Sequence, residues 1–356
     1  MATATSTDTI DTLLGQFREG KRIALARAIS LVENERPGFD YLLHEVHADL
    51  GRAQRIGITG PPGAGKSTLT SKLAQHFRDQ GERVGIVAVD PSSPFTGGAL
   101  LGDRIRMNNV STDPGVFIRS MATRGSLGGL ATTTKEVADL LDAFGFDRVI
   151  LETVGVGQSE LEIAGTADTT MVVLVPESGD SIQAMKAGLM EVADLFVINK
   201  ADRPGADKLA QELEVMLHMR LGEAQPAAAG HHGVSLKSVG KAARRQRKES
   251  VETQGGWSIP VMKTVAHKDE GLEEVRTTLG RHLGYLEESA ELSARRRRRM
   301  ADRTRAVVDR KLRERAWRSG EGERILEDAL SDLESGEETP YSVAERIVQE
   351  AIGQGG

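Results

Sequence analysis

The chain has 356 residues and a formal net charge of −6, and this acidic excess argues against a dedicated nucleic-acid-binding protein, which usually carries a basic footprint. It contains no cysteine, which excludes disulfides, thiolate zinc sites and cysteine nucleophiles and fits a reducing cytoplasm. No apolar run approaches the roughly 20 residues that span a bilayer, so we expect no contact with a membrane. The small, polar first ten residues show neither a secretory signal nor a transit peptide, and we expect a disordered tip there.

Residues 1–50 are expected to form an N-terminal helical extension. From Thr9 the apolar residues follow helical spacing, and Leu25, Ile29 and Val32 share one face. Pro37-Gly38 separates this helix from the next.

Residues 51–288 change to short β-branched runs separated by helical stretches. The runs lie at residues 55–59, 83–90, 116–120, 148–152, 169–175, 195–199 and 259–265. Continuous apolar strands that alternate with helices are typical of a mostly parallel sheet covered on both faces. We therefore predict a doubly wound α/β domain.

Residues 289–356 return to helical spacing, with Gly336 as a stop and Thr339-Pro340 as the N-cap and first turn of a last helix. The side chains expected on the apolar faces are Ile325, Ala329, Leu330, Leu333, Val343, Ile347 and Ala351. Two basic stretches, residues 237–248 and 295–299, are interpreted as solvated surface, with an acidic partner as the alternative.

A phosphate-binding loop is predicted at residues 60–67, whose sequence GPPGAGKS matches G-x4-G-K-[ST] between a predicted strand and a predicted helix. Backbone N–H groups and the helix N-terminus would bind the phosphates. Lys66 is expected to reach the β and γ phosphates, and Ser67 to ligate Mg²⁺. The loop consists of Gly60, Pro61, Pro62, Gly63, Ala64, Gly65, Lys66 and Ser67.

A base-recognition motif, Asn199-Lys200-Ala201-Asp202, follows the strand at residues 195–199. The Asp202 carboxylate can accept from the ring N–H and the exocyclic amine of guanine, whereas adenine presents no such pair of donors. Asn199 would brace the loop and the other edge of the base, and the stem of Lys200 would lie over the ring. The motif predicts GTP rather than ATP.

Two carboxylates are candidates for the metal site. Asp90 ends the second predicted strand and Glu152 ends the fourth, at the sheet edge where ligands bind in such folds. Carboxylate oxygens suit Mg²⁺, either directly or through water. Gly155 is free to bring its N–H to the γ-phosphate.

The group that activates water is left open by the sequence. Asp103 could polarise the water or respond to the γ-phosphate, and it could equally be an ordinary Asp at a helix N-terminus. Gln158, Arg104 and Arg124 are further candidates. Because phosphoryl transfer depends on positioning and charge stabilisation, we expect slow hydrolysis until a partner supplies these groups.

The motifs GPPGAGKST, VDPSSPFTGGALLGDRIRM, ETVGVGQSE and NKAD together resemble the MeaB/ArgK family of P-loop GTPases, of the SIMIBI class. The resemblance extends from about Thr9 to Ile352. It implies a GTPase that gates adenosylcobalamin loading and protects or reactivates an acyl-CoA mutase such as methylmalonyl-CoA mutase. Adenosylcobalamin would be met only through the mutase, and the terminal helical extensions would form a homodimer.

The resemblance also assigns site residues. Lys66, Asp103 and Glu152 would act in catalysis, with Asp103 in a switch that responds to the γ-phosphate. Lys66, Ser67 and Thr68 would bind phosphate and Mg²⁺, and Asn199, Lys200 and Asp202 would bind guanine. The metal site would comprise Ser67, Asp90, Asp103 and Glu152. Ala266 would belong to the loop over the guanine edge, where this sequence lacks the family's usual Ser-Ala form. Gln183 and Lys186, in the loop after the strand at 169–175, would transmit the nucleotide state to the mutase.

Three alternatives remain. A nickel-inserting GTPase would usually present His or Cys ligands near the nucleotide, and here the adjacent pair His231-His232 is the sole such feature. A small-molecule or protein kinase would need an acceptor pocket and a lid. A scaffold without activity would not need a complete set of phosphate and metal residues. The identity of the client mutase is not encoded in these motifs.

Overall fold

The computed structural model describes residues 2–90, 107–122, 132–153, 155, 159–178, 189–220, 256–318 and 320–353. The chain divides into two compact units, Met1–Leu292 and Ser293–Gly356. Among the described residues, no helix combines the length and the apolar character that a membrane span requires.

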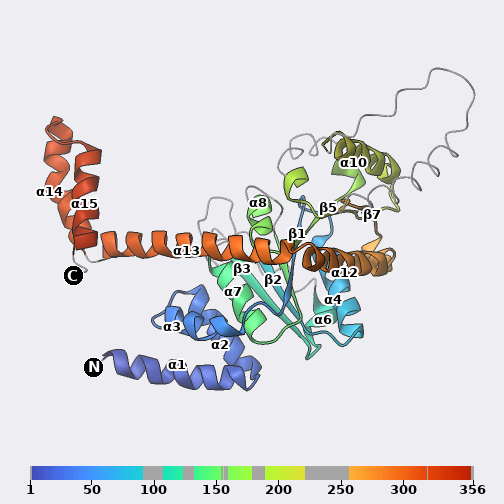
Figure 1. Ribbon diagram of the computed structural model, residues 1–356, viewed down its shortest axis with the longest axis horizontal. Helices are drawn as coiled ribbons and strands as arrows, with labels where there is room; N and C mark the ends of the chain where they lie inside the picture. The colour runs from blue at the N-terminus through green and yellow to red at the C-terminus, as the bar shows by residue number, and fades with distance from the viewer. Residues whose placement is uncertain are drawn as a thin grey trace, which may run out of the picture. The chain divides into compact units, whose positions relative to one another are not determined.

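The first unit is built on a seven-stranded sheet in the order β3-β2-β4-β1-β5-β6-β7, in which every neighbouring pair is parallel (Figure 1). The strands are β1 Gln54–Thr59, β2 Val84–Asp90, β3 Val116–Ala122, β4 Arg148–Glu152, β5 Thr169–Leu174, β6 Leu195–Ile198 and β7 Val261–Lys263. The predicted α/β fold is confirmed, and β1 lies at the centre of the sheet.

Helices cover both faces of this sheet. They are α4 Lys66–Asp79, α6 Asn108–Ser111, α7 Thr132–Ala143, α8 Ser159–Ala164, α10 Ala206–Arg220 and α12 Leu272–Glu288, with short 3-10 helices η2 Pro176–Ser178 and η3 Ala266–Lys268. Successive residues of β4 enter opposite cores: Val149 and Leu151 pack with α7, and Ile150 packs with α4 and α12. A strand buried on both faces is continuously apolar, which is why the β-branched runs were visible in the sequence.

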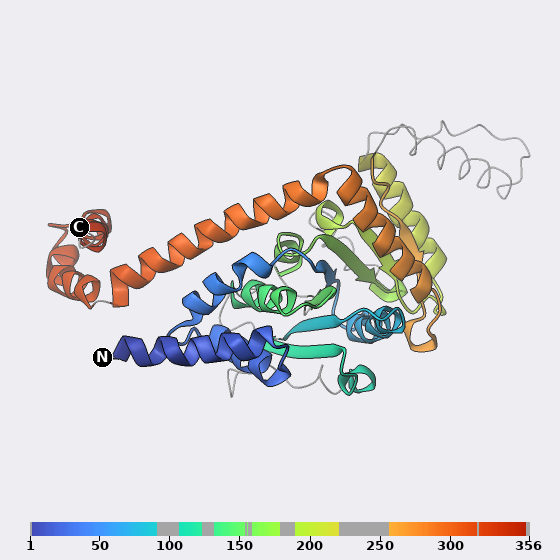
Figure 2. The same ribbon diagram turned by 60° about the horizontal axis from the view of Figure 1, so that its bottom comes forward.

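The N-terminal helices pack on one side of this domain, against α7 (Figure 2). They are α1 Ala2–Arg18, α2 Arg22–Glu33, α3 Phe39–Glu45 and the 3-10 turn η1 His47–Asp49. Leu25, Ile29 and Val32 of α2 are fully buried, as their spacing predicted. Arg22 Nη2 donates to Val116 O of the edge strand β3 at 2.6 Å, which joins the extension to the sheet.

The expectation of a disordered tip is wrong, because α1 begins at Ala2. Ile10, Leu14 and Phe17 are buried in the same core as α2. Helix propagation from such an anchored segment adds a hydrogen bond for each further residue, so polar residues before it can remain helical.

A buried carboxylate fixes the entry into β1. Asp142 of α7 accepts from Ala53 N at 2.9 Å and from Arg55 Nη2 at 2.9 Å, and Arg55 also pairs with Asp139 at 2.7 Å. Arg55 and Asp142 are both buried, so the ionic groups satisfy one another away from water. The strand that leads to the phosphate-binding loop is therefore held at its start as well as along its length.

The second unit contains three helices, of which the first starts just before it: α13 Glu291–Arg318, α14 Glu321–Ser335 and α15 Pro340–Gly353. Gly336 ends α14 with a φ of +78°, and Ser342 N donates to Thr339 Oγ1 at 3.2 Å at the start of α15. Both predicted helix boundaries are confirmed. The small core between α14 and α15 is formed by Ala329, Val343 and Ile347.

One residue of the predicted apolar face is misplaced, because Leu330 is 50% exposed. Two packed helices bury a narrow stripe, and here Ala329 lies at its centre with Ile325 and Leu333 beside it. Leu330, one residue on from Ala329, is turned out of that stripe.

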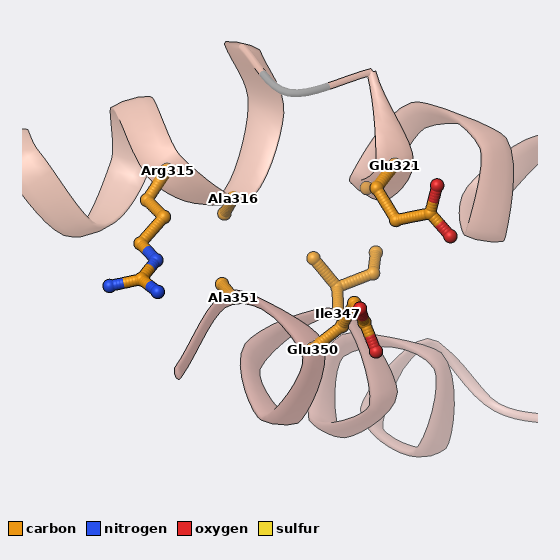
Figure 3. Close-up of a pocket in the computed structure, with 7 residues that line it drawn as sticks. Arg315, Ala316, Glu321, Ile347, Glu350 and Ala351 are labelled. Atoms are coloured by element: carbon orange, nitrogen blue, oxygen red, sulfur yellow. The ribbon is translucent and has the colours of Figure 1, made fainter. Parts of the chain in front are cut away.

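A pocket lies where the three helices of this unit meet (Figure 3). Ile347 and Ala351 of α15 face Ala316 of α13 and Glu321 of α14. A Cβ atom at Gly322 would lie 2.0 Å from Ala316 O, so the glycine is required for this close approach of α14 to α13.

Candidate functional site

The phosphate-binding loop connects β1 to the N-terminus of α4, as the motif predicts. Gly60 has a φ of +134°, and a Cβ atom there would lie 2.0 Å from Val173 O of the neighbouring strand β5. Gly65 has a φ of +86°, and its Cβ would lie 2.4 Å from Asn199 Nδ2. The backbone at these two positions excludes any side chain, which explains the glycines of the motif.

Lys66 begins α4 and is buried, with its ammonium held over the loop. Its Nζ donates to Gly60 O at 2.8 Å and to Pro61 O at 3.0 Å. A Cβ atom at Gly155 would lie 2.7 Å from Lys66 Nζ and 1.9 Å from Gly60 O. The structure therefore brings Gly155 against Lys66 and Gly60, three positions that the sequence assigned to one phosphate site.

Glu152 lies at the carboxyl end of β4, next to β1, and is buried at 4% exposure. Ser67 Oγ donates to its Oε1 at 2.6 Å, and Thr70 Oγ1 donates to its Oε2 at 2.8 Å. Thr70 was missed by sequence reasoning, although its position three residues after Ser67 places both on one face of α4.

These carboxylate and hydroxyl oxygens fit Mg²⁺, a hard cation that prefers oxygen ligands. Among the described residues, no group of three or more His, Asp or Glu side chains could hold a metal ion. Mg²⁺ commonly binds through one or two protein ligands together with substrate phosphates. Ser67 and Glu152 therefore suit an ion that arrives with a nucleotide.

Asn199 joins the base motif to the phosphate loop through its buried carboxamide. Its Nδ2 donates to Ala64 O at 2.8 Å, and its Oδ1 accepts from Ala266 N at 3.1 Å. Lys200, with a φ of +55°, donates from Nζ to Gly63 O at 2.8 Å. Two of the predicted guanine residues, Asn199 and Lys200, thus lie directly beside the predicted phosphate loop.

Asp202 is exposed at the end of the same motif, with its carboxylate 3.3 Å from Lys268 Nζ. Desolvation acts to raise the pKa of Asp202, but the hydrogen bond from Lys268 and a backbone hydrogen bond outweigh it and hold the pKa below its ordinary value. The carboxylate is therefore an ionised acceptor at neutral pH, as recognition of two guanine donors requires.

Several predicted residues lie outside what the structure describes. Thr68 is described and is exposed on α4, whereas Asp90 is described only as the last residue of β2, without its side chain. The predicted residues that fall entirely outside the description are Asp103, Arg104, Arg124, Gln158, Gln183, Lys186, His231 and His232, with the basic stretch 237–248.

The parallel sheet with this loop after its central strand defines the class of protein, a P-loop GTPase. Residues 25–321 match the family model described as methylmalonyl Co-A mutase-associated GTPase MeaB. The chain therefore belongs to the MeaB family, and the family predicted from the sequence motifs is confirmed.

Individual relatives agree with this assignment. A Pyrococcus abyssi protein with the name Putative GTPase is 43% identical over 350 residues, and the alignment covers 97% of this chain and 98% of the Pyrococcus protein. The mouse protein named methylmalonic aciduria type A homolog, mitochondrial, is 36% identical over 302 residues, covering 81% of this chain and 66% of its own. Escherichia coli GTPase ArgK is 44% identical over 191 residues, covering 52% and 58%.

A crystal structure described as LAO/AO transport system kinase superposes with a TM-score of 0.62 and 24% identity, covering 96% of this chain and 97% of that one. At this identity the likeness supports the fold alone.

Proposed function

We propose that this GTPase gates the loading of adenosylcobalamin onto an acyl-CoA mutase and protects or reactivates that mutase in the cytoplasm. The observation that carries the proposal is the match of residues 25–321 to a family described as mutase-associated. The name of the mouse relative, which refers to methylmalonic aciduria, points to the same metabolism. Adenosylcobalamin would be held by the mutase and not by this chain.

In the proposed reaction, a water oxygen attacks the γ-phosphorus of GTP and the bond from that phosphorus to the β–γ bridging oxygen breaks. The electron pair of this bond stays on GDP, and the proton of the water passes to the released phosphate or to solvent. Lys66 would stabilise negative charge on the β and γ phosphates, and the N–H of Gly155 would contact the γ-phosphate. Mg²⁺, when bound at Ser67 and Glu152 with Asp90, would neutralise phosphate charge.

Guanine would be recognised on the other side of the loop. Asp202 would accept from two donors of the base, while Asn199 holds the surrounding loops together. Asp103 remains a proposed switch and catalytic residue, and Thr68 a proposed phosphate neighbour.

We expect slow turnover for the isolated chain and stimulation by its mutase, because no water-orienting glutamine or arginine finger is recognisable from spacing. GTPase rates should rise at least about tenfold when the client mutase is added, since a partner that orients water can accelerate hydrolysis much further than this. The measurement is phosphate release with and without methylmalonyl-, isobutyryl-, ethylmalonyl- and 2-hydroxyisobutyryl-CoA mutases.

Two variants serve as a control and as a test of signal transmission in that assay. Lys66→Ala with mutase present reports any contaminating activity. Lys186→Ala should retain the basal rate and lose stimulation if Gln183 and Lys186 transmit the nucleotide state. A basal rate that no mutase of the panel changes would refute the proposed partnership, although the chain would remain a GTPase.

We also propose that the second unit forms a homodimer. α13 carries twelve arginine and lysine residues against four acidic ones, whereas residues 320–353 carry ten acidic residues against two arginines. Oppositely charged surfaces of two copies attract one another. Exposed apolar side chains accompany both charge groups, namely Val308, Leu312, Leu330, Tyr341 and Val348.

The chain should therefore elute with a mass near twice 38.4 kDa in size-exclusion chromatography with light scattering. Leu330→Glu combined with Val348→Glu should shift the population toward monomer, because both side chains are exposed and the change adds charge to an apolar contact. Ser331→Glu, an exposed neighbour on α14, is the matched control. A monomer with GTP, with GDP and at every dilution would contradict the dimer.

A further inference from the structure

The segment after β7 forms a closed loop beside the base motif. Val265 N donates to Glu270 O at 3.1 Å and Glu270 N donates to Val265 O at 3.4 Å, so residues 265–270 are tied at their base. Inside this loop, Ala266 N reaches Asn199, and Lys268 reaches Asp202 at 3.3 Å. One side of the loop therefore contacts the residues proposed to bind guanine.

The other side of the loop contacts α4, the helix that begins with Lys66. Asp269 Oδ1 lies 2.9 Å from His76 Nε2, and its Oδ2 lies 3.9 Å from Lys72 Nζ. Lys72 and His76 are four residues apart, so both lie on one face of α4. The loop is thus joined to the helix that supports the phosphate site by a hydrogen bond between Asp269 and His76 and by a longer ion pair between Asp269 and Lys72.

Asp269 has a φ of +65°, a conformation that L side chains other than Asn and Asp rarely adopt. Such backbone conformations cost free energy, so they occur where contacts with the surrounding structure stabilise them. The backbone of Asp269 also donates from its N–H to Ala266 O at 3.3 Å, and its side chain extends to α4.

The second ring nitrogen of His76, Nδ1, lies 3.4 Å from Glu273 Oε2 in the first turn of α12. The Arg276 guanidinium, with a smaller contribution from His76, lowers the pKa of Glu273 to about 2, so this carboxylate is ionised at neutral pH. The imidazole side chain is 20% exposed and lies between two carboxylates. The imidazole therefore lies between the loop and the first turn of α12.

We propose that His76 is a positioning residue for base selectivity. Through its contact with Asp269, His76 holds the Ala266–Lys268 turn at a fixed position relative to α4, the helix that follows the phosphate-binding loop. This inference rests on the proposed assignment of guanine to Asn199 and Asp202. It adds a residue on α4 that lies outside the proposed base and phosphate contacts and that would set how well these two parts of the site fit one nucleotide.

The test compares four variants of the full chain: His76→Ala, His76→Gln, Asp269→Gly and Gln75→Ala. His76→Ala should raise the KM for GTP about two- to fivefold, the effect expected from losing one partly exposed hydrogen bond. Its kcat should stay within about twofold of the unchanged protein, because the phosphate residues remain in place. The ratio of kcat/KM for GTP over ATP should fall.

The other variants separate the causes. Glutamine can place an N–H near the position of His76 Nε2, so His76→Gln should restore the KM. Asp269→Gly tolerates the positive φ and lacks the carboxylate, so it should behave like His76→Ala if the contact between Asp269 and His76 positions the loop. Gln75 donates to Asp79 on the exposed face of α4, so Gln75→Ala should change neither the KM for GTP nor the preference for GTP over ATP.

Hydrogen–deuterium exchange supplies a readout besides activity. Backbone amides of residues 264–271 should exchange faster in His76→Ala and Asp269→Gly, whereas those of β1 should not change. The inference would be overturned if His76→Ala left both the KM for GTP and the ratio of kcat/KM for GTP over ATP unaltered. It would also be overturned if kcat/KM fell equally for GTP and ATP, because equal losses indicate general destabilisation. If Asp202→Asn leaves GTP preference intact, the proposed guanine assignment has failed instead.

Discussion

Lys66→Ala is expected to lower the turnover number for GTP by about 10²- to 10³-fold, the cost typical of removing one preorganised charge donor from an active site. The Lys66 ammonium is buried and held at 2.8 Å from Gly60 O and 3.0 Å from Pro61 O. Alanine would remove the positive charge that is proposed to stabilise the β and γ phosphates, while the backbone N–H groups of the loop would remain. Phosphate release at saturating GTP and Mg²⁺ measures the effect.

Lys208→Ala provides a control for the loss of one positive charge, because Lys208 is exposed and pairs with Glu212 within α10 at 3.8 Å. Its turnover should equal that of the unchanged protein. Full GTP turnover in Lys66→Ala would require the assignment of the phosphate site to be abandoned.

Asp202→Asn is expected to exchange one nucleotide preference for another. The variant should lose about 10²- to 10⁴-fold in kcat/KM for GTP, because two hydrogen bonds to a charged acceptor are replaced by an unfavourable contact between donors. Xanthosine triphosphate carries a carbonyl oxygen where guanine carries its amine, so the Asn amide can donate to it. The kcat/KM for this nucleotide should rise.

Asp207→Asn is the matched control for this change. Asp207 is an exposed carboxylate at the start of α10 that pairs with Lys263, and its replacement should leave both nucleotides unaffected. A GTP preference that survives in Asp202→Asn would refute guanine recognition by this motif.

The proximity of several residues of the candidate nucleotide site was predictable, because they lie at places that short sequence patterns mark. Lys66 follows a glycine-rich loop, Glu152 ends a buried strand, and Asn199 follows another. In a parallel sheet the carboxyl ends of such strands meet at one edge, so spacing along the chain translates into proximity.

The contacts that hold these residues were not predictable in the same way. His76 and Asp269 are 193 positions apart, and neither belongs to a motif. Asp142 pairs with backbone groups about 90 residues earlier. Such pairs depend on which helix packs against which loop, and helical periodicity specifies an apolar face without specifying its partner.

In the second unit too, local features were predictable from the sequence and packing was not. Its helix boundaries followed from Gly336 and from Thr339-Pro340, which act locally. The exposure of Leu330 depended instead on the width of the packed stripe, which the spacing of apolar residues overestimates.

The Asn199 carboxamide has an evolutionary consequence that reaches beyond ligand recognition. It donates to Ala64 O in the phosphate loop and accepts from Ala266 N in the loop after β7. An aspartate at this position would set a carboxylate oxygen against a carbonyl oxygen, and a shorter side chain would leave a buried polar group unpaired. A variant selected for another base would still need asparagine here, because the residue joins two loops whichever nucleotide they enclose.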